Sequence, residues 1–168
     1  MSIIHKTLEN PPYNLPTVVF SLDDLYLTHA DQVNLASRHP DNPLLQHRGQ
    51  PSTHDIRLAN LVFSSLCQNA PTGIPEYDKA AYNGQGDRVP EAHWQKVNAE
   101  GQNTTKLVLF EGWSVGFRPL SDRDLKQKWG HAVMAREAVN YVGRLGHNTL
   151  ESVVEVNSAL REYNQITE

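Results

Sequence analysis

Two short apolar runs stand out along the chain, and both end at acidic residues. The first, LPTVVFSL, covers residues 15–22 and is followed by Asp23 and Asp24. The second, KLVLF, covers residues 106–110 and is followed by Glu111. Neither run alternates between apolar and polar positions, which is typical of strands that are covered on both faces in a parallel sheet. We therefore expect two buried, parallel strands at these positions.

Two helical patterns follow the first of these runs. Thr28, with Asp31 three residues later, resembles a capping box and predicts a short helix toward Ser37. Ser52 or Thr53 can cap a second helix. The apolar face of that second helix recurs at the helical period, at Ile56, Ala59, Val62, Phe63 and Leu66.

The rest of the chain contains one long irregular segment and two further helical patterns. Residues 69–101 are dominated by turn signals such as Asn-Gly and Gly-Gln-Gly, and a loop of this length is uncommon in a compact domain unless it is functional. Ser121 with Asp124 predicts a helix start, and Thr149 predicts the cap of a final helix over residues 150–163. Strands that alternate with helices predict an α/β domain with a largely parallel sheet. We interpret the whole chain, residues 1–168, as a single domain.

The composition is that of an ordinary soluble globular protein. Hydrophobic residues make up 39% and charged residues 20% of the 168 positions. The net charge of −4 offers no basic surface for nucleic acid, and no apolar run approaches the roughly 20 residues that a membrane span requires. The single cysteine, Cys67, cannot form an internal disulfide, and no signal peptide is visible. We therefore expect a cytoplasmic protein in which Cys67 is a buried thiol.

The acidic residues at the two strand ends are candidates for one shared site. Ligands of open parallel sheets bind outside the carboxyl ends of the strands, so Asp23 or Asp24 and Glu111 could converge there. Neighbouring carboxylates repel one another unless a cation, a positive side chain or a proton compensates them. Mg²⁺ with a bound polyphosphate fits such a group, and one carboxylate could accept the proton of a substrate hydroxyl during phosphoryl transfer. The alternative is that each acid only caps the helix that follows it.

Charged side chains in two glycine-containing loops are the other candidates. The segment QHRGQPSTHD contains Arg48 and His54, and PEYDKAAYNGQGDR contains Lys79 and Arg88. Arginine and lysine at a sheet edge suit an anionic substrate, and arginine can bind carboxylate or phosphate through two hydrogen bonds. The alternative is that these charges are simply solvated. A zinc site fits less well, because the histidines lack ligand spacing and there is no second cysteine.

Four motifs, in this order, resemble those of the D-glycerate 3-kinase group of P-loop kinases and, more distantly, pantothenate and uridine kinases. The motifs are SLDDLYLT, NPLLQHRGQPSTHD, YDKAAYNGQGDR and LVLFEGWSVGFRPL. The resemblance extends from about Asn10 to Leu120 and, more weakly, into VNSALREY. It implies a three-layer P-loop NTPase-like fold, with a parallel sheet and helices on both faces. It also implies an ATP-dependent kinase that transfers the γ-phosphoryl group to the hydroxyl of a small acid such as D-glycerate.

The resemblance further implies roles for individual residues. Asp23 corresponds to the acid after the second strand of the family, which is a catalytic base or Mg²⁺ partner, and Asp24 beside it stays a candidate metal ligand. Glu111 corresponds to the acidic residue of the Walker B strand, which is associated with Mg²⁺ and with catalysis. The substrate- and phosphate-contacting loops of the family contain the counterparts of Arg48, His54, Lys79 and Arg88.

The sequence also departs from this family. The kinases begin with a strand, a glycine-rich loop ending in Gly-Lys-Ser/Thr and a helix, whereas no glycine of this sequence is followed by lysine. Because that loop cradles the phosphates of ATP, we expect a truncated domain with impaired ATP binding and catalysis. The family also continues past VNSALREY. Without the family's first strand, KLVLF is left with an unpaired apolar edge, which favours self-association.

Three alternatives to an active kinase stay open. The chain could be a non-catalytic, pseudokinase-like module that binds the substrate or regulates a partner. The sequence could also be a fragment of a reading frame that begins upstream of Met1. A metal-dependent hydrolase that uses the same carboxylates remains only if the resemblance is misleading. The loop charges do not distinguish glycerate from another hydroxy acid.

Overall fold

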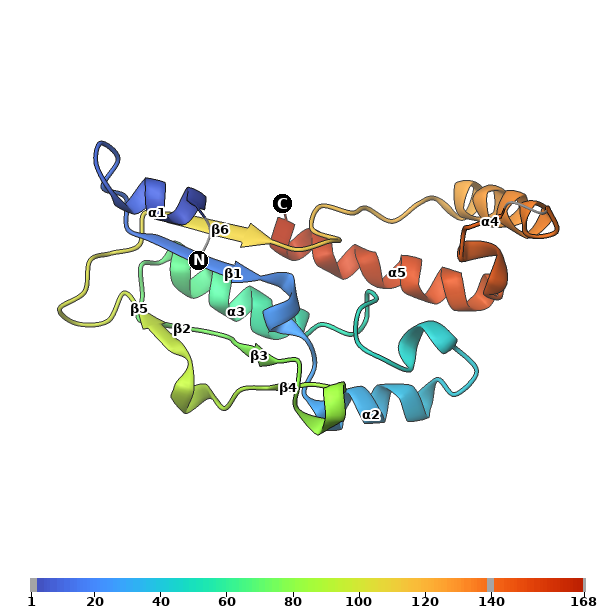
Figure 1. The fold of residues 1–168 in the computed structure, drawn as a ribbon, viewed down its shortest axis with the longest axis horizontal. Helices are drawn as coiled ribbons and strands as arrows, with labels where there is room; N and C mark the ends of the chain where they lie inside the picture. Colours follow the sequence, from blue (N-terminus) through green and yellow to red (C-terminus); the bar gives the residue numbers. More distant parts are fainter. Residues whose placement is uncertain (1–2, 139–140, 168) are drawn as a thin grey trace. The chain divides into compact units, whose positions relative to one another are not determined.

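The computed structural model describes residues 3–138 and 141–167 (Figure 1). The chain forms two compact units, each built from two separate stretches of sequence. The first unit is Met1–His29 with His54–Val115, and the second is Ala30–Thr53 with Gly116–Glu168. All strands found among the described residues belong to the first unit, whereas the second is helical.

The two predicted parallel strands are present in the first unit. β1 (Thr17–Ser21) pairs in parallel with β6 (Leu107–Glu111), and Ser21 lies opposite Glu111. Most side chains of β1 are buried, whereas those of β6 are only partly covered. The register brings the carboxyl ends of both strands to the same edge, which is the placement that the two acidic strand ends predicted.

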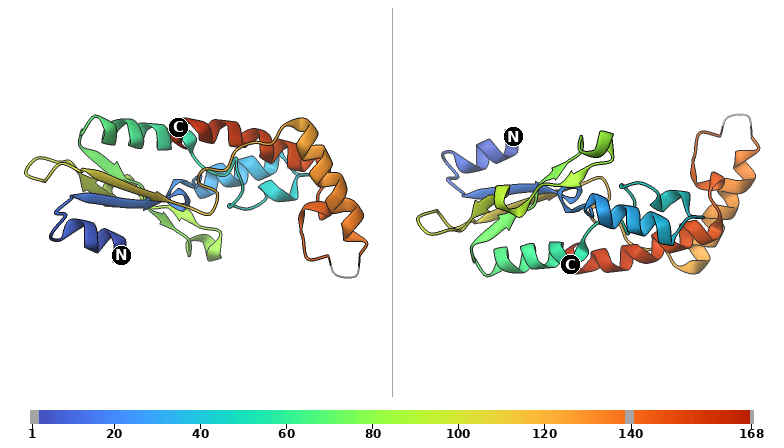
Figure 2. Two further views of the ribbon diagram at one scale, coloured as in Figure 1. Left: turned by 90° about the horizontal axis from the view of Figure 1, so that it is seen from above. Right: turned by 90° about the horizontal axis from the view of Figure 1, so that it is seen from below.

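Helices cover both faces of this pair of strands (Figure 2). α1 (Ile3–Glu9) lies on one face, against β1, and α3 (Ile56–Cys67) lies on the other. The ring of Phe63 on α3 has its centroid 5.4 Å from that of Phe20 and 5.0 Å from that of Phe110. Since these two phenylalanines come from β1 and β6, one aromatic cluster joins the helix to both strands.

Two small antiparallel pairs occupy the segment that was expected to be irregular. β2 (Thr72–Ile74) pairs with β5 (Gln95–Val97), and β3 (Tyr77–Asp78) pairs with β4 (Asp87–Arg88). The expectation of a loop over residues 69–101 is therefore wrong in part. Strands of two or three residues are too short to show an alternating pattern, and their partners are distant in the sequence.

The second unit contains three α-helices among its described residues. α2 (His29–Arg38) belongs to it except for its first residue, and α4 (Asp122–Arg136) and α5 (Leu150–Thr167) follow later in the chain. Ser121 caps α4 by accepting the backbone N–H of Asp124 at 3.1 Å, as predicted. Short 3-10 helices also occur in the described parts of both units, at η1 (Leu22–Leu25), η2 (Pro43–Leu45), η3 (Tyr82–Gly84), η4 (Glu91–His93) and η5 (Leu145–His147).

Surface properties bear on three of the expectations. Cys67, the last residue of α3, is exposed, so the expectation of a buried thiol is wrong; the buried face of that helix ends one residue earlier, at Leu66. Across residues 3–138 and 141–167, β6 pairs with β1 alone, which agrees with the predicted unpaired edge. No helix within the same residues is long and apolar enough to cross a membrane.

Candidate functional site

The end of β1 is fixed by a reciprocal cap. The Oγ of Ser21 accepts the backbone N–H of Asp23 at 3.2 Å, and Oδ2 of Asp24 accepts the backbone N–H of Ser21 at 2.8 Å. These bonds satisfy donors at the start of η1. Burial raises the pKa of Asp24 above its usual value, against the hydrogen bonds from the backbone of Ser21 and Tyr77. For Asp24, then, the interpretation as a helix cap holds.

Asp23 has a different environment from its neighbour. Its Oδ2 lies 2.7 Å from Nζ of Lys79, and its Oδ1 is buried with no hydrogen-bond partner among the described residues. Burial pushes the pKa of Asp23 upward, but hydrogen bonds from the side chains of Lys79 and Tyr26 and the charge of Lys79 outweigh it, so the pKa lies below its usual value. Asp23 is thus a charged carboxylate with one oxygen paired and the other unsatisfied.

A buried aromatic stack supports this carboxylate. The side chains of Tyr26 and His54 are each 5% exposed, and their ring centroids lie 4.4 Å apart. Tyr77 contacts Tyr26 edge-on at 5.3 Å. Burial lowers the pKa of His54 to about 4, against the attraction of Asp23, so the imidazole is neutral at pH 7. The structure therefore places His54 beside Asp23 as a buried neutral group, and its contact with a substrate stays a prediction.

Arg88 connects three parts of the first unit. Its Nη2 donates to the backbone carbonyl of Tyr26 at 2.8 Å and lies 3.1 Å from Oδ2 of Asp55. Asp55 is at the same time the N-cap of α3, where its Oδ1 accepts the backbone N–H of Leu58 at 2.8 Å. The side chain of Arg88 is 14% exposed. Arg88 thus holds β4 against the end of η1 and the start of α3, and its predicted role as a substrate ligand has no direct support in this arrangement.

The loop between β3 and β4 carries Lys79 and is anchored at its far end. The ring of Tyr82 stacks on that of His29, with centroids 3.7 Å apart and planes 3° apart. Nε2 of His29 lies 3.0 Å from Oε1 of Gln85, and its backbone N–H donates to Oδ1 of Asp87 at 2.8 Å. These contacts hold the loop whose first residue reaches Asp23.

Glu111 lies exposed at the end of β6. Because it is in register with Ser21, it shares the sheet edge with Asp23. The parts of the chain that the structure describes contain no group of three or more histidine, cysteine or acidic side chains arranged to hold a metal ion. The expected set of Asp23, Asp24 and Glu111 is therefore not assembled as a preformed metal site, since Asp24 turns back to cap Ser21.

Arg48 belongs to the second unit, whereas Asp23, His54, Lys79, Arg88 and Glu111 belong to the first. It precedes Gly49, which has a φ of +135° and donates its backbone N–H to Oγ1 of Thr53 at 2.9 Å. Only glycine adopts such a backbone conformation without strain. Thr53, expected to cap α3, is used in this turn instead, and Asp55 takes over the cap. The role of Arg48 in substrate binding stays a prediction.

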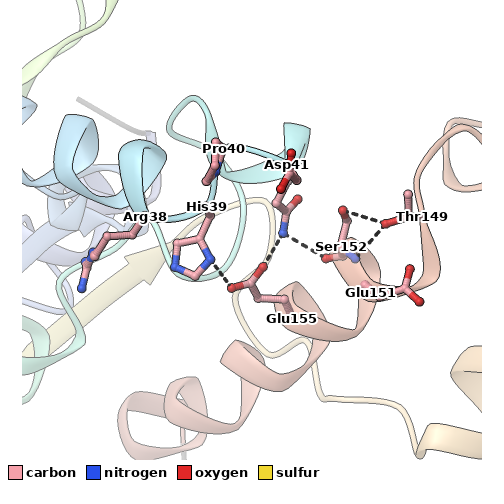
Figure 3. A pocket seen from close by; sticks show the side chains of 9 residues that line it. Arg38, His39, Pro40, Asp41, Thr149, Glu151, Ser152 and Glu155 are labelled. Atoms are coloured by element: carbon pink, nitrogen blue, oxygen red, sulfur yellow. Dashed lines mark hydrogen bonds and ion pairs between the residues drawn. The ribbon is translucent and has the colours of Figure 1, made fainter.

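A surface cavity of about 440 Å³ lies in the second unit and contains none of the predicted site residues. Figure 3 shows Glu155 of α5 facing His39, whose Nδ1 is 2.6 Å from Oε1 of the carboxylate. The other oxygen of Glu155 accepts Nδ2 of Asn42 at 2.6 Å. The residues that line the cavity are Arg38, His39, Pro40, Asp41, Asn42, Thr149, Glu151, Ser152 and Glu155.

The geometry adds one functional residue that the sequence did not single out. The side chain of Tyr26 forms a hydrogen bond with Asp23 and stacks on His54. Its backbone carbonyl accepts a hydrogen bond from Arg88. The available signal was its position in SLDDLYLT, three residues after Asp23, which is close to one turn of a helix. In the first unit, therefore, Asp23, His54, Lys79 and Arg88 form one connected group, with Glu111 at the same sheet edge.

Comparison with known proteins finds kinases. No family model matches the chain. The chain is 50% identical over 109 residues to the uncharacterized kinase mug58 of Schizosaccharomyces pombe, a match that covers 64% of this chain and 38% of that protein. It is 36% identical over 108 residues to the chloroplastic D-glycerate 3-kinase of Arabidopsis thaliana, which covers 62% of this chain and 23% of that protein.

A solved structure extends the likeness to nearly the whole chain. The D-glycerate 3-kinase from Cryptococcus neoformans var. grubii matches with a TM-score of 0.83 and 35% sequence identity, over 96% of this chain and 53% of that chain. The likeness confirms the expected α/β fold with a parallel sheet. This chain therefore spans about half of that structure, and 38% and 23% of the two curated relatives.

Proposed function

We propose, because the chain is homologous to part of the D-glycerate 3-kinases, that it forms the acceptor side of an ATP-dependent kinase of small hydroxy acids. The observation that carries the proposal is the state of Asp23. It is an ionised carboxylate at the carboxyl edge of two parallel strands, one of its oxygens is unsatisfied, and Lys79 stands beside it. A base and a cation side by side suit an acceptor that carries both a hydroxyl and a carboxylate.

In the proposed reaction, the acceptor hydroxyl oxygen attacks the γ-phosphorus of ATP. A new P–O bond forms, the bond from the γ-phosphorus to the β–γ bridging oxygen breaks, and ADP leaves with that electron pair. The hydroxyl proton passes to the carboxylate of Asp23, which must be unprotonated beforehand. The lowered pKa of Asp23 keeps it unprotonated at neutral pH, and Tyr26 orients it through a hydrogen bond.

We include Mg²⁺ as the metal that accompanies ATP. Asp23 offers an unsatisfied buried oxygen, and Glu111 is exposed at the end of the adjacent strand. Two carboxylates fit Mg²⁺, which keeps several waters and takes other ligands from substrate phosphates. Bound there, Mg²⁺ would neutralise negative charge on the phosphates. Asp24 is left out of this set because its carboxylate is committed to the cap of η1.

The phosphate-binding part of the reaction has no counterpart in this sequence. None of its glycines is followed by lysine, and a Gly-Lys-Ser/Thr loop is what cradles the phosphates of ATP in P-loop kinases. We therefore assign acceptor binding and the general base to this chain. We expect weak or no phosphoryl transfer by the chain alone.

Calorimetric titration of the purified chain with D-glycerate, and separately with MgATP, tests the acceptor assignment. We expect saturable binding of D-glycerate and much weaker binding of MgATP, because only the acceptor groups are present. Glycerol, which has the hydroxyls and lacks the carboxylate, is the control ligand. Binding of MgATP without detectable binding of D-glycerate would contradict the proposal.

A second candidate function is a non-catalytic module that binds the acid, and the absence of a Gly-Lys pair favours it. Phosphoryl transfer from ATP to D-glycerate at high protein concentration separates the two. Transfer that is lost in Asp23→Asn supports a kinase, because the base is then required. Binding of D-glycerate with no transfer above the protein-free rate supports the module.

We further propose that the protein is cytoplasmic and associates with itself through the outer edge of β6. That strand pairs with β1 alone across the described residues, and an unpaired edge presents backbone N–H and C=O groups to another chain. Sedimentation velocity over a range of protein concentrations checks the association. A monomer at every concentration would contradict it.

A further inference from the structure

The proposed base is masked by Lys79. Oδ2 of Asp23 lies 2.7 Å from the lysine Nζ, and Oδ1 is buried. A general base must lie within hydrogen-bond reach of the proton that it accepts. An acceptor hydroxyl therefore competes with the ammonium of Lys79 for Oδ2.

Only the side chain of Lys79 has to move. The loop that carries it is held at its far end by the stack of Tyr82 on His29. The same stretch contains consecutive left-handed backbone positions, with φ of +51° at Tyr82 and +56° at Asn83, a conformation that persists only where the surroundings fix it. The lysine side chain itself is 58% exposed, and its four-carbon stem is flexible. The flexible side chain of Lys79 thus extends from a loop whose backbone is held in place.

We infer that Lys79 selects an acidic acceptor and unmasks the base, because it leaves Asp23 for the carboxylate of the bound acid. This inference rests on the proposed function and deepens it. The exchange replaces one ammonium–carboxylate pair with another, so Lys79 stays paired while the carboxylate of Asp23 becomes available to the acceptor hydroxyl. A neutral alcohol offers no such replacement, and Asp23 stays covered.

The strength of the contacts is consistent with an exchange. An ion pair whose lysine is more than half exposed is weak, because water screens it. Arg88 cannot serve as the mobile cation, since Tyr26 and Asp55 already hold its guanidinium.

Calorimetry of D-glycerate binding to four forms of the chain tests the exchange. The forms are the wild type, Lys79→Met, Asp23→Asn and the double variant, with glycerol as the neutral probe. Lys79→Met should weaken D-glycerate binding at least tenfold but should not weaken glycerol binding, because glycerol has no carboxylate for the lysine to pair with. Asp23→Asn should tighten D-glycerate binding about threefold to fivefold, because the ion pair with Asp23 no longer competes for the lysine. The double variant should bind like Lys79→Met.

The outcomes separate this inference from the function on which it rests. If Asp23→Asn binds D-glycerate with unchanged or lower affinity, Lys79 is not exchanged, although the acceptor assignment still stands. If Lys79→Met keeps the wild-type preference for D-glycerate over glycerol, another cation selects the acid and the inference is overturned. If the wild type does not bind D-glycerate at all, the proposed function itself fails.

Discussion

Tyr26 and His54 stack with their ring centroids 4.4 Å apart and 24° between the ring planes. Tyr26 is the C-cap of η1, and His54 directly precedes Asp55, the N-cap of α3. The stack therefore joins the end of the β1 segment to the start of the helix that covers the sheet. Because a charged imidazole would lose its hydration in this buried position, the protein holds His54 neutral.

Stability should depend on pH through His54. The pKa of this residue is about 4 in the folded chain and 6.5 ordinarily, so between these values the unfolded chain binds more protons. The free energy of unfolding then rises with pH across this window, and as the pH falls through it the chain loses on the order of 3 kcal/mol. Below about pH 4 both states are protonated and this loss is complete.

Urea unfolding at steps between pH 4 and pH 7 measures this dependence. His54→Gln should remove the contribution of His54 to the rise of the unfolding free energy with pH, whatever the substitution does to stability at pH 7. His93→Gln is the matched control, because His93 is exposed, and it should keep the wild-type slope. An unchanged slope in His54→Gln would show that other groups cause the pH dependence.

Tyr26→Phe should raise the pKa of Asp23. The substitution keeps the aromatic stack but removes the hydroxyl whose hydrogen bond favours the charged carboxylate. A ¹³C NMR titration of the aspartate carboxyl groups reports the change directly. Tyr13→Phe, at an exposed tyrosine, should leave the titration of Asp23 unaltered. Identical titrations of Asp23 in Tyr26→Phe and the wild type would refute the proposed hydrogen-bond role.

Arg88→Met should destabilise the first unit by about 1–3 kcal/mol. The change removes the donor to the carbonyl of Tyr26 and leaves the half-buried carboxylate of Asp55 without its partner. Arg57→Met is the control, since Arg57 is exposed on α3, and it should change the free energy of unfolding by less than about 0.5 kcal/mol. Equal effects of the two substitutions in urea unfolding would argue against a structural role for Arg88.

Asn157→Ala should destabilise the second unit. The amide of Asn157 bonds to both polar backbone groups of Leu120: Oδ1 accepts the N–H at 2.8 Å, and Nδ2 donates to the carbonyl at 3.0 Å. Two hydrogen bonds from a buried side chain are worth about 1–3 kcal/mol when their partners stay unsatisfied. Arg161→Ala, on the exposed side of the same helix, should cost less than about 0.5 kcal/mol. Thermal unfolding that does not distinguish the two variants would contradict this role.

Local sequence patterns were enough to place the framework of the fold. The apolar runs placed β1 and β6, and the spacing of Ser121 and Asp124 placed the start of α4, because strand burial and helix capping depend on residues close in the sequence. The pairs β2–β5 and β3–β4 could not be predicted in the same way. Their stability comes from partners far along the chain, and two or three residues show no period.

Residue identity was not enough to assign the site. Asp23 and Asp24 are adjacent and identical in chemistry, yet only Asp24 folds back onto the N–H of Ser21. That difference arises from the backbone geometry at the start of η1. Similarly, Lys79 and Arg88 stand as two cations of one loop in the sequence, whereas the structure holds Arg88 in the scaffold and leaves Lys79 more than half exposed beside Asp23.

The location of bound D-glycerate tests the account most directly. A ¹H–¹⁵N correlation titration of the wild-type chain follows the backbone amide signals of both units in one experiment. The account predicts shifts that saturate together at Asp23, Lys79 and their neighbours in the first unit, with no change at Asn42 and Ser152 in the cavity of the second. Shifts confined to the cavity residues, or no shift at Asp23 and Lys79, would contradict it.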